Sequence, residues 1–264
     1  MLYQKIIRPI LFKTDPEWIH GFVVIFLAFL SKLKPLSWLI KKFCFVNDRR
    51  LKTDIGNLVL ENPVGLAAGF DKDIDAPYAY PMLGFGFAEM GSITYSAQSG
   101  NPKPRLWRLP KDQSLIVYYG LCNNGAKAAR ARLVKLKKQA RPFGVSIALT
   151  TGLDLARMAD DYVNSFLELY DVADYLVLNV SCPNVANCNV LKQISFIEEL
   201  LGKIEQIVQE KDISKDIFIK IGPEMEEDDL DQIIELSLKY GLAGIVATNL
   251  VKKRSNLPQH KSSD

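Results

Sequence analysis

From Leu51 onward, short apolar runs alternate with longer stretches in which apolar residues recur at helical spacing. In the clearest helical stretch, 227–240, apolar residues recur every three or four positions with acidic residues between them. Strands that alternate with helices indicate a parallel sheet with helical crossovers. The expected strands are 64–68, 87–90, 144–148, 175–179, 217–221 and 244–248, and the expected helices are 74–82, 126–138, 153–170, 190–209 and 227–240.

The number of expected strands limits the fold. A closed βα barrel has eight strands and commonly needs about 250 residues, whereas six strands are found, and only 214 residues follow the first 50. The pattern therefore predicts an α/β fold with about six βα units in a domain spanning 51–264, arranged either as part of a barrel or as an open sheet. Such a partial barrel would expose strand edges and an apolar strip. Before the first unit, Gly56-Asn57 predicts the turn of a short hairpin within 51–60.

Residues 1–50 differ from the rest of the chain in their pattern of apolar residues, and they are expected to form a separate helical segment. Asp15 followed by Pro16 predicts a helix start, with Asp15 as the N-cap. The apolar run over 22–30 is too short to span a bilayer, which takes about 20 residues. Acidic residues precede this run and no small-residue cleavage site follows it, so a signal peptide is a poor fit. Pro35 then breaks the pattern before a second, mostly apolar stretch.

Two interpretations of this segment remain open. One is a pair of helices packed on the rest of the protein. The other is a helical hairpin in the membrane interface, with apolar side chains toward the lipid and lysines at the headgroups. Trp18, Trp38 and Phe43 suit that interface, where aromatic side chains are enriched.

Composition excludes several classes of function. Apolar residues make up 48% of the chain and charged residues 24%, which is ordinary for a globular protein and excludes a disordered tail and a polytopic membrane protein. A formal net charge of +3 gives no support to nucleic-acid binding. Four scattered cysteines without a CxxC pair, together with two histidines, predict no metal site and a reducing compartment.

Small and polar residues gather where the expected strands end. The first strand runs into Gly69 and Lys72, the fourth into the loop 179–184, and the fifth into Lys220. In barrels and open α/β sheets this edge carries the active site. Small residues let a flat ligand approach the backbone, asparagines donate and accept hydrogen bonds, and lysines favour an anionic ring or a carboxylate. Cys182 lies in a loop, where a thiolate could act as a base.

Each of these signals is weak alone. A lone lysine at a strand end is more often a solvated charge, and a lone cysteine is usually a buried small apolar residue. Their recurrence at several strand ends predicts one shared pocket. The motifs that carry this pattern are Gly65-Leu66-Ala67-Ala68-Gly69-Phe70-Asp71-Lys72, Lys103-Pro104-Arg105, Gly120-Leu121-Cys122-Asn123, Asn179-Val180-Ser181-Cys182-Pro183-Asn184, Lys220-Ile221 and Ala247-Thr248-Asn249.

These motifs resemble those of the dihydroorotate dehydrogenases, FMN-dependent βα-barrel enzymes of pyrimidine synthesis. The resemblance covers nearly the whole chain. It implies a fold of the TIM (βα)8-barrel type, here with about six βα units, and oxidation of dihydroorotate to orotate. Cys182 would be the catalytic base, which removes a proton from C5 of dihydroorotate while a hydride leaves C6 for the flavin. The residues implied to bind FMN are Ala68, Gly69, Lys72, Ser92, Ser146, Asn179, Lys220 and Thr248, and those implied to bind the substrate are Lys72, Gly120, Leu121, Asn123, Asn179, Asn184 and Asn249.

The resemblance is mixed with respect to class. Asp15-Pro16-Glu17 and His20 resemble the start of the membrane-associated class, in which a helix pair forms a tunnel for a quinone. Cys182 resembles the soluble class, because the quinone class typically has serine at this position. We therefore expect a quinone-type architecture with a cysteine base, attached peripherally to the cytoplasmic side of a membrane.

The chain also departs from the family pattern. Val117 stands where an asparagine usually holds orotate, and Ser146 stands where an asparagine contacts the flavin. The last two βα units, which carry the FMN phosphate loops in the family, are missing, so we expect either a fragment or a truncated product. Two alternatives to the family activity therefore stay open: a related FMN oxidoreductase that acts on another planar ring, and an inactive remnant.

Overall fold

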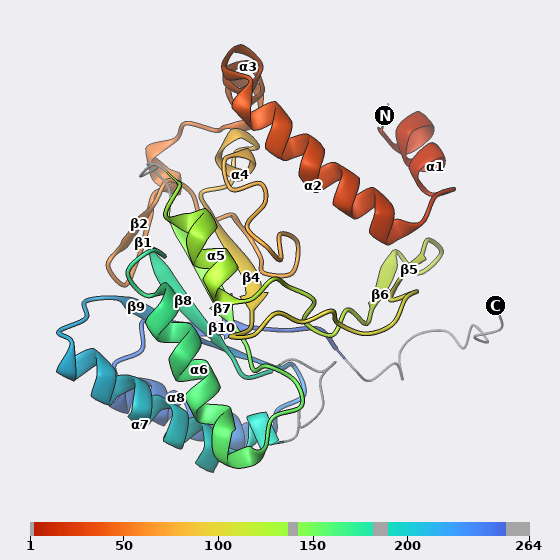
Figure 1. Cartoon of the computed structure of the whole chain (residues 1–264). Coiled ribbons are helices and arrows are strands. Elements are labelled where there is room, and N and C mark those ends of the chain that lie inside the picture. The colour runs from red at the N-terminus through yellow and green to blue at the C-terminus, as the bar shows by residue number, and fades with distance from the viewer. Residues whose placement is uncertain (1–2, 137–141, 182–189, 252–264) are drawn as a thin grey trace.

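The centre of the molecule is a curled parallel sheet. We describe it from a computed structural model, which covers residues 3–136, 142–181 and 190–251. Six strands lie in the order β10-β9-β8-β7-β4-β3, and helices cover the outer face of the sheet (Figure 1). The bounds are β3 Gly65–Leu66, β4 Phe87–Ile93, β7 Phe143–Ile147, β8 Tyr175–Asn179, β9 Asp216–Ile221 and β10 Gly244–Ala247.

This arrangement confirms the partial barrel predicted from the sequence. Every neighbouring pair of strands in the sheet is parallel, and each of the six expected strands is present. The register places Asn179 of β8 beside Lys220 of β9, and Gly91 of β4 beside Ser146 of β7. Because parallel strands end at the same edge, this register brings polar side chains together there.

Four amphipathic helices follow the strands as expected. In α6, the side chains of Met158, Tyr162 and Phe166 recur every four residues and are fully buried against the sheet. The same spacing buries one face of α7 and of α8. The bounds are α5 Ala126–Leu133, α6 Leu155–Leu169, η3 Val190–Lys192, α7 Ile194–Glu210 and α8 Glu227–Lys239.

The helix predicted over 74–82 is wrong for most of its length, since α4 comprises only Ala79–Met82. The residue before Pro77 is disfavoured in helical geometry, and Ile74 has a positive φ of 61°. The carboxylate of Asp71 instead accepts hydrogen bonds from the backbone N–H groups of Asp75 and Ala76, at 2.8 and 2.9 Å. These contacts hold 71–76 as a loop around the Asp71 carboxylate.

Two antiparallel hairpins lie outside the sheet. The expected hairpin is confirmed by β1 Thr53–Ile55 and β2 Leu58–Leu60, with Gly56 at a positive φ of 58° in the turn. The second hairpin, formed by β5 Leu106–Leu109 and β6 Ser114–Val117, was not predicted. Its connection, Pro110 to Gln113, contains no glycine, so it carries no strong hairpin signal.

The amino-terminal helix pair is confirmed by α2 Pro16–Lys32 and α3 Lys34–Cys44. Asp15 caps α2 by accepting a hydrogen bond from the Trp18 N–H at 2.8 Å. The short elements η1 Tyr3–Ile7 and α1 Arg8–Leu11 precede the pair, and η2 Arg49–Leu51 follows it. No single helix in the described residues is long and apolar enough to cross a bilayer, but α2 and α3, bent by 107°, pass this test together.

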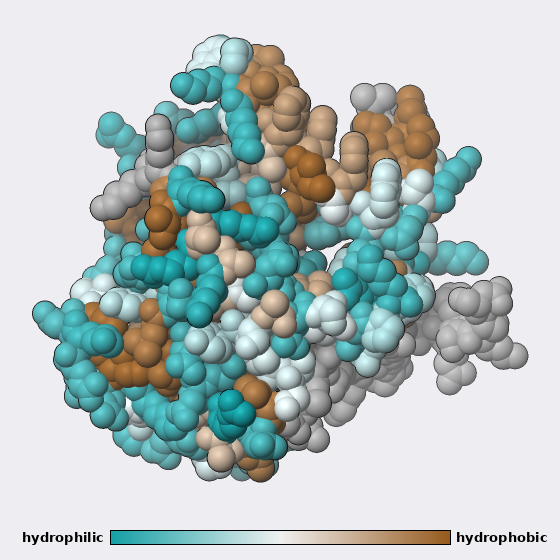
Figure 2. Space-filling model, in the orientation of Figure 1, coloured by the Kyte–Doolittle hydropathy of each residue, from teal (hydrophilic) through white to brown (hydrophobic). Residues whose placement is uncertain are grey.

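Side chains on α2 and α3 form an exposed apolar surface. Helix α2 contacts α4 and β5, and α3 contacts α4, so the pair packs on the domain as the first interpretation requires. Its outer side nevertheless carries the large apolar patch that the second interpretation requires, visible at the top of the molecule (Figure 2). We call these residues the apolar helical surface: Trp18, Phe22, Ile25, Phe26, Phe29, Trp38 and Phe43.

Candidate active site

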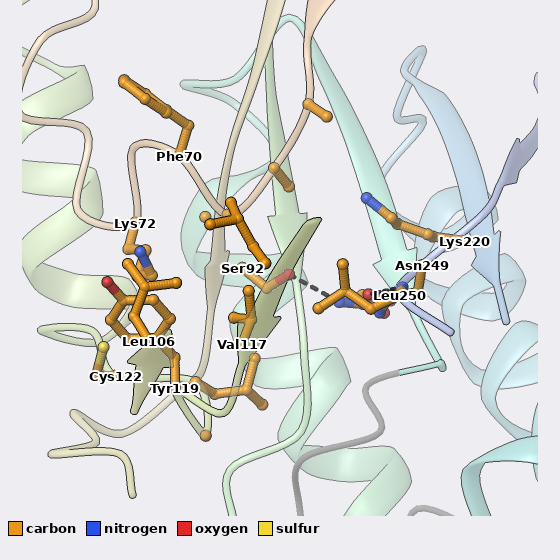
Figure 3. A pocket seen from close by; sticks show the side chains of 18 of the residues that line it. Phe70, Lys72, Ser92, Leu106, Val117, Tyr119, Cys122, Lys220, Asn249 and Leu250 are labelled. Carbon is orange, nitrogen blue, oxygen red and sulfur yellow. Dashed lines mark hydrogen bonds between the residues drawn. The ribbon is translucent and has the colours of Figure 1, made fainter. Parts of the chain in front are cut away.

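A cavity of about 520 Å³ opens at the edge of the sheet where the strands end. This volume is typical of a small-molecule site. Leu106 and Val117 of the β5–β6 hairpin form an apolar wall on one side of it (Figure 3). Leu115 of the same hairpin also lines the cavity. The predicted site residues that line the cavity are Ala68, Gly69, Lys72, Ser92, Gly120, Leu121, Asn179, Lys220, Thr248 and Asn249.

A hydrogen-bond network fixes the polar floor of this cavity. Asn179 Nδ2 donates to Ser92 Oγ at 2.8 Å, and Ser92 Oγ lies 2.7 Å from Ser146 Oγ. The Ser181 hydroxyl donates to Asn179 Oδ1 at 3.0 Å and accepts from Asn249 Nδ2 at 3.2 Å. Four segments of the barrel thereby hold one another in place, so the floor is organised before any ligand binds. Ser146 belongs to this network, but it is fully buried behind Ser92.

The backbone at Gly69 is open to the cavity. Gly69 has a positive φ of 106°, and a Cβ built on it would meet no atom within 4 Å. Its N–H donates to the carbonyl of Gly91 at 2.7 Å, which anchors the turn to β4. A flat ligand can therefore lie directly against this turn, where the left-handed conformation favours glycine.

Lys220 supplies a buried cation on the floor. Its Nζ lies 3.4 Å from Glu89 Oε1, and both side chains are more than 90% buried. Burial raises the pKa of the Glu89 carboxyl, although the Lys220 charge and the Ala68 N–H act in the opposite direction. Glu89 was not predicted as a site residue. The signal for it was a charged residue within the otherwise apolar strand β4.

A second cation, Lys72, lies on the other side of the cavity (Figure 3). Burial lowers the pKa of this lysine. Its Nζ lies 3.9 Å from the centre of the Tyr119 ring. Cys122 lines the cavity beside these two residues, and burial raises the pKa of its thiol. Tyr119 and Cys122 were not predicted as site residues, although Cys122 belongs to the motif Gly120-Leu121-Cys122-Asn123.

His20 of α2 and Phe70 line the cavity side by side. Their rings meet edge to face, with the centres 5.0 Å apart. Burial lowers the pKa of His20, with the Lys72 charge acting in the same direction. Among the residues covered by the structure, His20 Nε2 has no hydrogen-bond partner. A buried polar atom without a partner, on a residue that lines a cavity, is available to a ligand.

Three predicted substrate or catalytic residues are not placed in this cavity. Asn123 lines an adjoining cavity of about 480 Å³. Its amide donates to Thr94 Oγ1 at 2.8 Å and to the Leu121 carbonyl at 2.7 Å, so it braces the loop. Cys182 and Asn184 lie outside the described residues, and their roles stay predictions.

The family model for dihydroorotate dehydrogenase matches residues 50–263. This range includes every strand of the curled sheet, and every residue that lines the cavity except His20. The chain belongs to the dihydroorotate dehydrogenase family. The expectation drawn from the strand-end motifs is thereby confirmed, and the curled sheet is the part of a dihydroorotate dehydrogenase barrel that these residues form.

Curated relatives extend the match to the amino-terminal helices. A dihydroorotate dehydrogenase (quinone) of Nostoc punctiforme is 40% identical over 265 residues, covering 97% of this chain and 69% of that protein. One of Rhodococcus erythropolis is 37% identical over 256 residues, covering 97% and 70%. A crystal structure of the Eimeria tenella enzyme in complex with ferulenol superposes with a TM-score of 0.77 at 28% identity, covering 92% of this chain and 68% of that chain.

Proposed function

We propose that this protein oxidises dihydroorotate to orotate in pyrimidine synthesis, with FMN as cofactor and a quinone as electron acceptor. The observation that carries the proposal is the cavity, because the family motifs from separate strand ends line one space. Relatives that share 97% of the chain's length and are named as quinone enzymes support both the reaction and the acceptor.

The residues present fit a flavin. FMN supplies a planar ring that accepts a hydride and becomes electron-rich when reduced. The open backbone at Gly69 leaves room for such a ring, and the Lys220 ammonium would stabilise its anionic edge. Ser92 and Asn179 offer a hydroxyl and an amide, which suit ring nitrogens and oxygens. Ala68 and Thr248 would complete the contacts.

The substrate would bind on the Lys72 side of the cavity. A buried ammonium suits the carboxylate of dihydroorotate, and the amides of Asn179 and Asn249 suit its ring. Gly120 and Leu121 would contribute backbone contacts. The base proposed from the family motif is Cys182, which follows directly after the buried Ser181 of the floor network.

The full-length protein mixed with dihydroorotate and a short-chain quinone should form orotate, measured by liquid chromatography. The purified protein should be yellow, and acid release should yield FMN. Val117 in the apolar wall favours a second candidate, a related flavin enzyme for a less polar planar ring. A yellow protein that forms no orotate would favour that candidate, and a colourless protein would overturn both.

We propose that the apolar helical surface attaches the protein to a membrane interface. Trp38 and Phe43 are 63% and 82% exposed on α3, and Lys41 and Lys42 lie beside them at headgroup level in such an arrangement. An amphipathic helix with aromatic residues on one side and lysines at its end is typical of interfacial binding. This position would place the cavity, which His20 of α2 lines, near a membrane-dissolved quinone.

The substitution Phe43→Glu should weaken binding to anionic lipid vesicles roughly tenfold or more. Burying an apolar side chain contributes about 1.5–3 kcal/mol, and about 1.4 kcal/mol corresponds to tenfold in affinity. Co-sedimentation with vesicles measures the effect. Leu238→Glu is the matched control, since Leu238 is 78% exposed on α8. Equal loss in both variants, or no loss in Phe43→Glu, would contradict the proposed attachment.

A further inference from the structure

Two cations lie against the ring of Tyr119. Lys72 Nζ is 3.9 Å from the ring centre, and the guanidinium carbon of Arg105 is 5.1 Å from it. The hydroxyl of Tyr119 is buried, and it has no hydrogen-bond partner within the described part of the chain. The contacts that Tyr119 makes with charged groups are therefore made by its aromatic ring, which attracts cations through its negative face.

The Lys72 ammonium lies over the face of this ring. Within residues 3–136, 142–181 and 190–251, Lys72 forms no ion pair, although Asp71 and Asp73 are its neighbours in sequence. Asp71 is engaged by backbone N–H groups and by the Tyr80 hydroxyl. The ammonium therefore rests on an aromatic face, which holds a cation without neutralising it. A cation held in this way keeps its charge available to an anionic ligand in the cavity.

Arg105 is in turn fixed from three directions. Its Nη2 donates to Glu17 Oε1 at 2.9 Å, and its Nη1 donates to the carbonyls of Ser99 and Asn101 at 2.8 and 3.0 Å. Lys103 Nζ also lies 3.2 Å from Glu17 Oε1. Burial opposes ionisation of Glu17, but the hydrogen bonds from Arg105 and Lys103 outweigh it and lower the pKa of Glu17.

Glu17 belongs to the first turn of α2, which is part of the amino-terminal helix pair. A continuous chain of contacts thus runs from that helix through Arg105 and Tyr119 to Lys72 at the cavity. The two ends of the chain lie 55 residues apart in sequence, between positions 17 and 72. Each of these contacts involves a buried or half-buried group.

We propose that Tyr119 is a positioning residue for Lys72, and that the Glu17–Arg105 pair holds Tyr119 in place. The ring directs the ammonium toward the carboxylate of dihydroorotate. Because Glu17 belongs to α2, the affinity for the substrate then depends on how α2 packs against the domain. This inference rests on the proposed function for the identity of the anion. It assigns Tyr119 no direct contact with the substrate.

The test compares orotate binding among variants of the full-length protein by isothermal titration calorimetry. Tyr119→Leu removes the aromatic face and should raise the Kd for orotate by about 3- to 30-fold, the range expected for a desolvated cation–π contact. The KM for dihydroorotate should rise in parallel, with a much smaller change in kcat. Tyr119→Phe retains the ring and should restore tight binding. Glu17→Gln should raise the Kd in the same direction by a smaller factor.

Tyr118→Leu is the matched control, because Tyr118 is the neighbouring tyrosine and is 48% exposed. Its Kd should equal that of the wild type. Wild-type affinity in Tyr119→Leu would overturn the positioning role, and so would a loss in Tyr119→Phe as large as in Tyr119→Leu. An unchanged Kd in Glu17→Gln would overturn the link to α2. A loss of thermal stability that matched the loss of affinity across the series would indicate a merely structural role.

A second measurement is independent of the substrate. Acetic anhydride labels lysines, and peptide mass mapping reports the labelling rate of Lys72. Tyr119→Leu should label Lys72 several-fold faster because the ammonium is released from the ring, whereas Tyr119→Phe and Tyr118→Leu should match the wild type. Equal rates in all four proteins would overturn the inference. Failure of the proposed function would instead appear as a wild-type protein that does not bind orotate at all.

Discussion

Replacing Cys182 by alanine should slow the oxidation of dihydroorotate by roughly 10²- to 10⁴-fold, the contribution typical of a general base. The prediction rests on the family motif and on the position of the cysteine immediately after Ser181, whose hydroxyl belongs to the cavity floor. Removal of the thiol leaves no group at this position that can take a proton. Stopped-flow bleaching of the yellow protein by dihydroorotate measures the effect.

The second half-reaction separates a base from a structural cysteine. Reoxidation by quinone does not use the base, so its rate should be little changed in Cys182→Ala. Cys182→Ser should retain activity only at higher pH, since a hydroxyl is harder to deprotonate than a thiol with a pKa of about 8.5. Cys44→Ala, at an exposed position on α3, is the control. An equal loss of rate in both half-reactions of Cys182→Ala would exclude Cys182 as the base. If Cys122→Ala slowed flavin reduction by roughly 10²- to 10⁴-fold and Cys182→Ala did not, the base would be Cys122.

The substitution Asp71→Ala should lower the free energy of unfolding by about 3–5 kcal/mol. The Asp71 carboxylate is 1% exposed and accepts hydrogen bonds from the N–H groups of Asp75 and Ala76 and from the Tyr80 hydroxyl, at 2.8, 2.9 and 2.7 Å. A buried donor left without its acceptor costs about 1–3 kcal/mol. The loss should also loosen the turn that carries Lys72 and weaken orotate binding.

Urea unfolding followed by circular dichroism measures this effect. Tyr80→Phe removes one donor together with its need for an acceptor, so it should cost only about 0.5–1.5 kcal/mol. The double variant should cost less than the sum of the two single ones, because the two side chains interact directly. Asp231→Ala, at an exposed position on α8, should stay within about 0.5 kcal/mol of the wild type. A cost for Asp71→Ala no larger than this control would contradict the bracing role.

Much of the barrel follows from local sequence. The strand predicted over 175–179 is observed with the same bounds, since a continuous apolar run is the usual signature of a strand buried on both faces. Asp15 caps α2 as predicted, and Gly56 turns the first hairpin. Each of these features depends on residues within a few positions of one another, so the local sequence is sufficient to predict it.

Most of the candidate site could also be predicted, because parallel strands bring their ends to one edge. Residues as far apart as Gly69, Asn179 and Lys220 therefore line the same cavity. The exceptions are predicted residues whose side chains are buried or already hydrogen-bonded and therefore do not line the cavity. Ser146 is buried behind Ser92, and the amide of Asn123 is engaged within its own loop. Strand-end position alone does not distinguish a lining residue from a bracing one.

What the sequence by itself determined was the order of the βα units, the caps and turns, and the set of polar residues at the strand ends. Only the tertiary structure decided that 71–76 wraps around the Asp71 carboxylate instead of forming a helix, and that Glu17 pairs with Arg105, 88 residues further along the chain. The physical reason is the range of the interactions. Periodicity and capping act between near neighbours, whereas an ion pair or a cation–π contact requires the chain to have folded first.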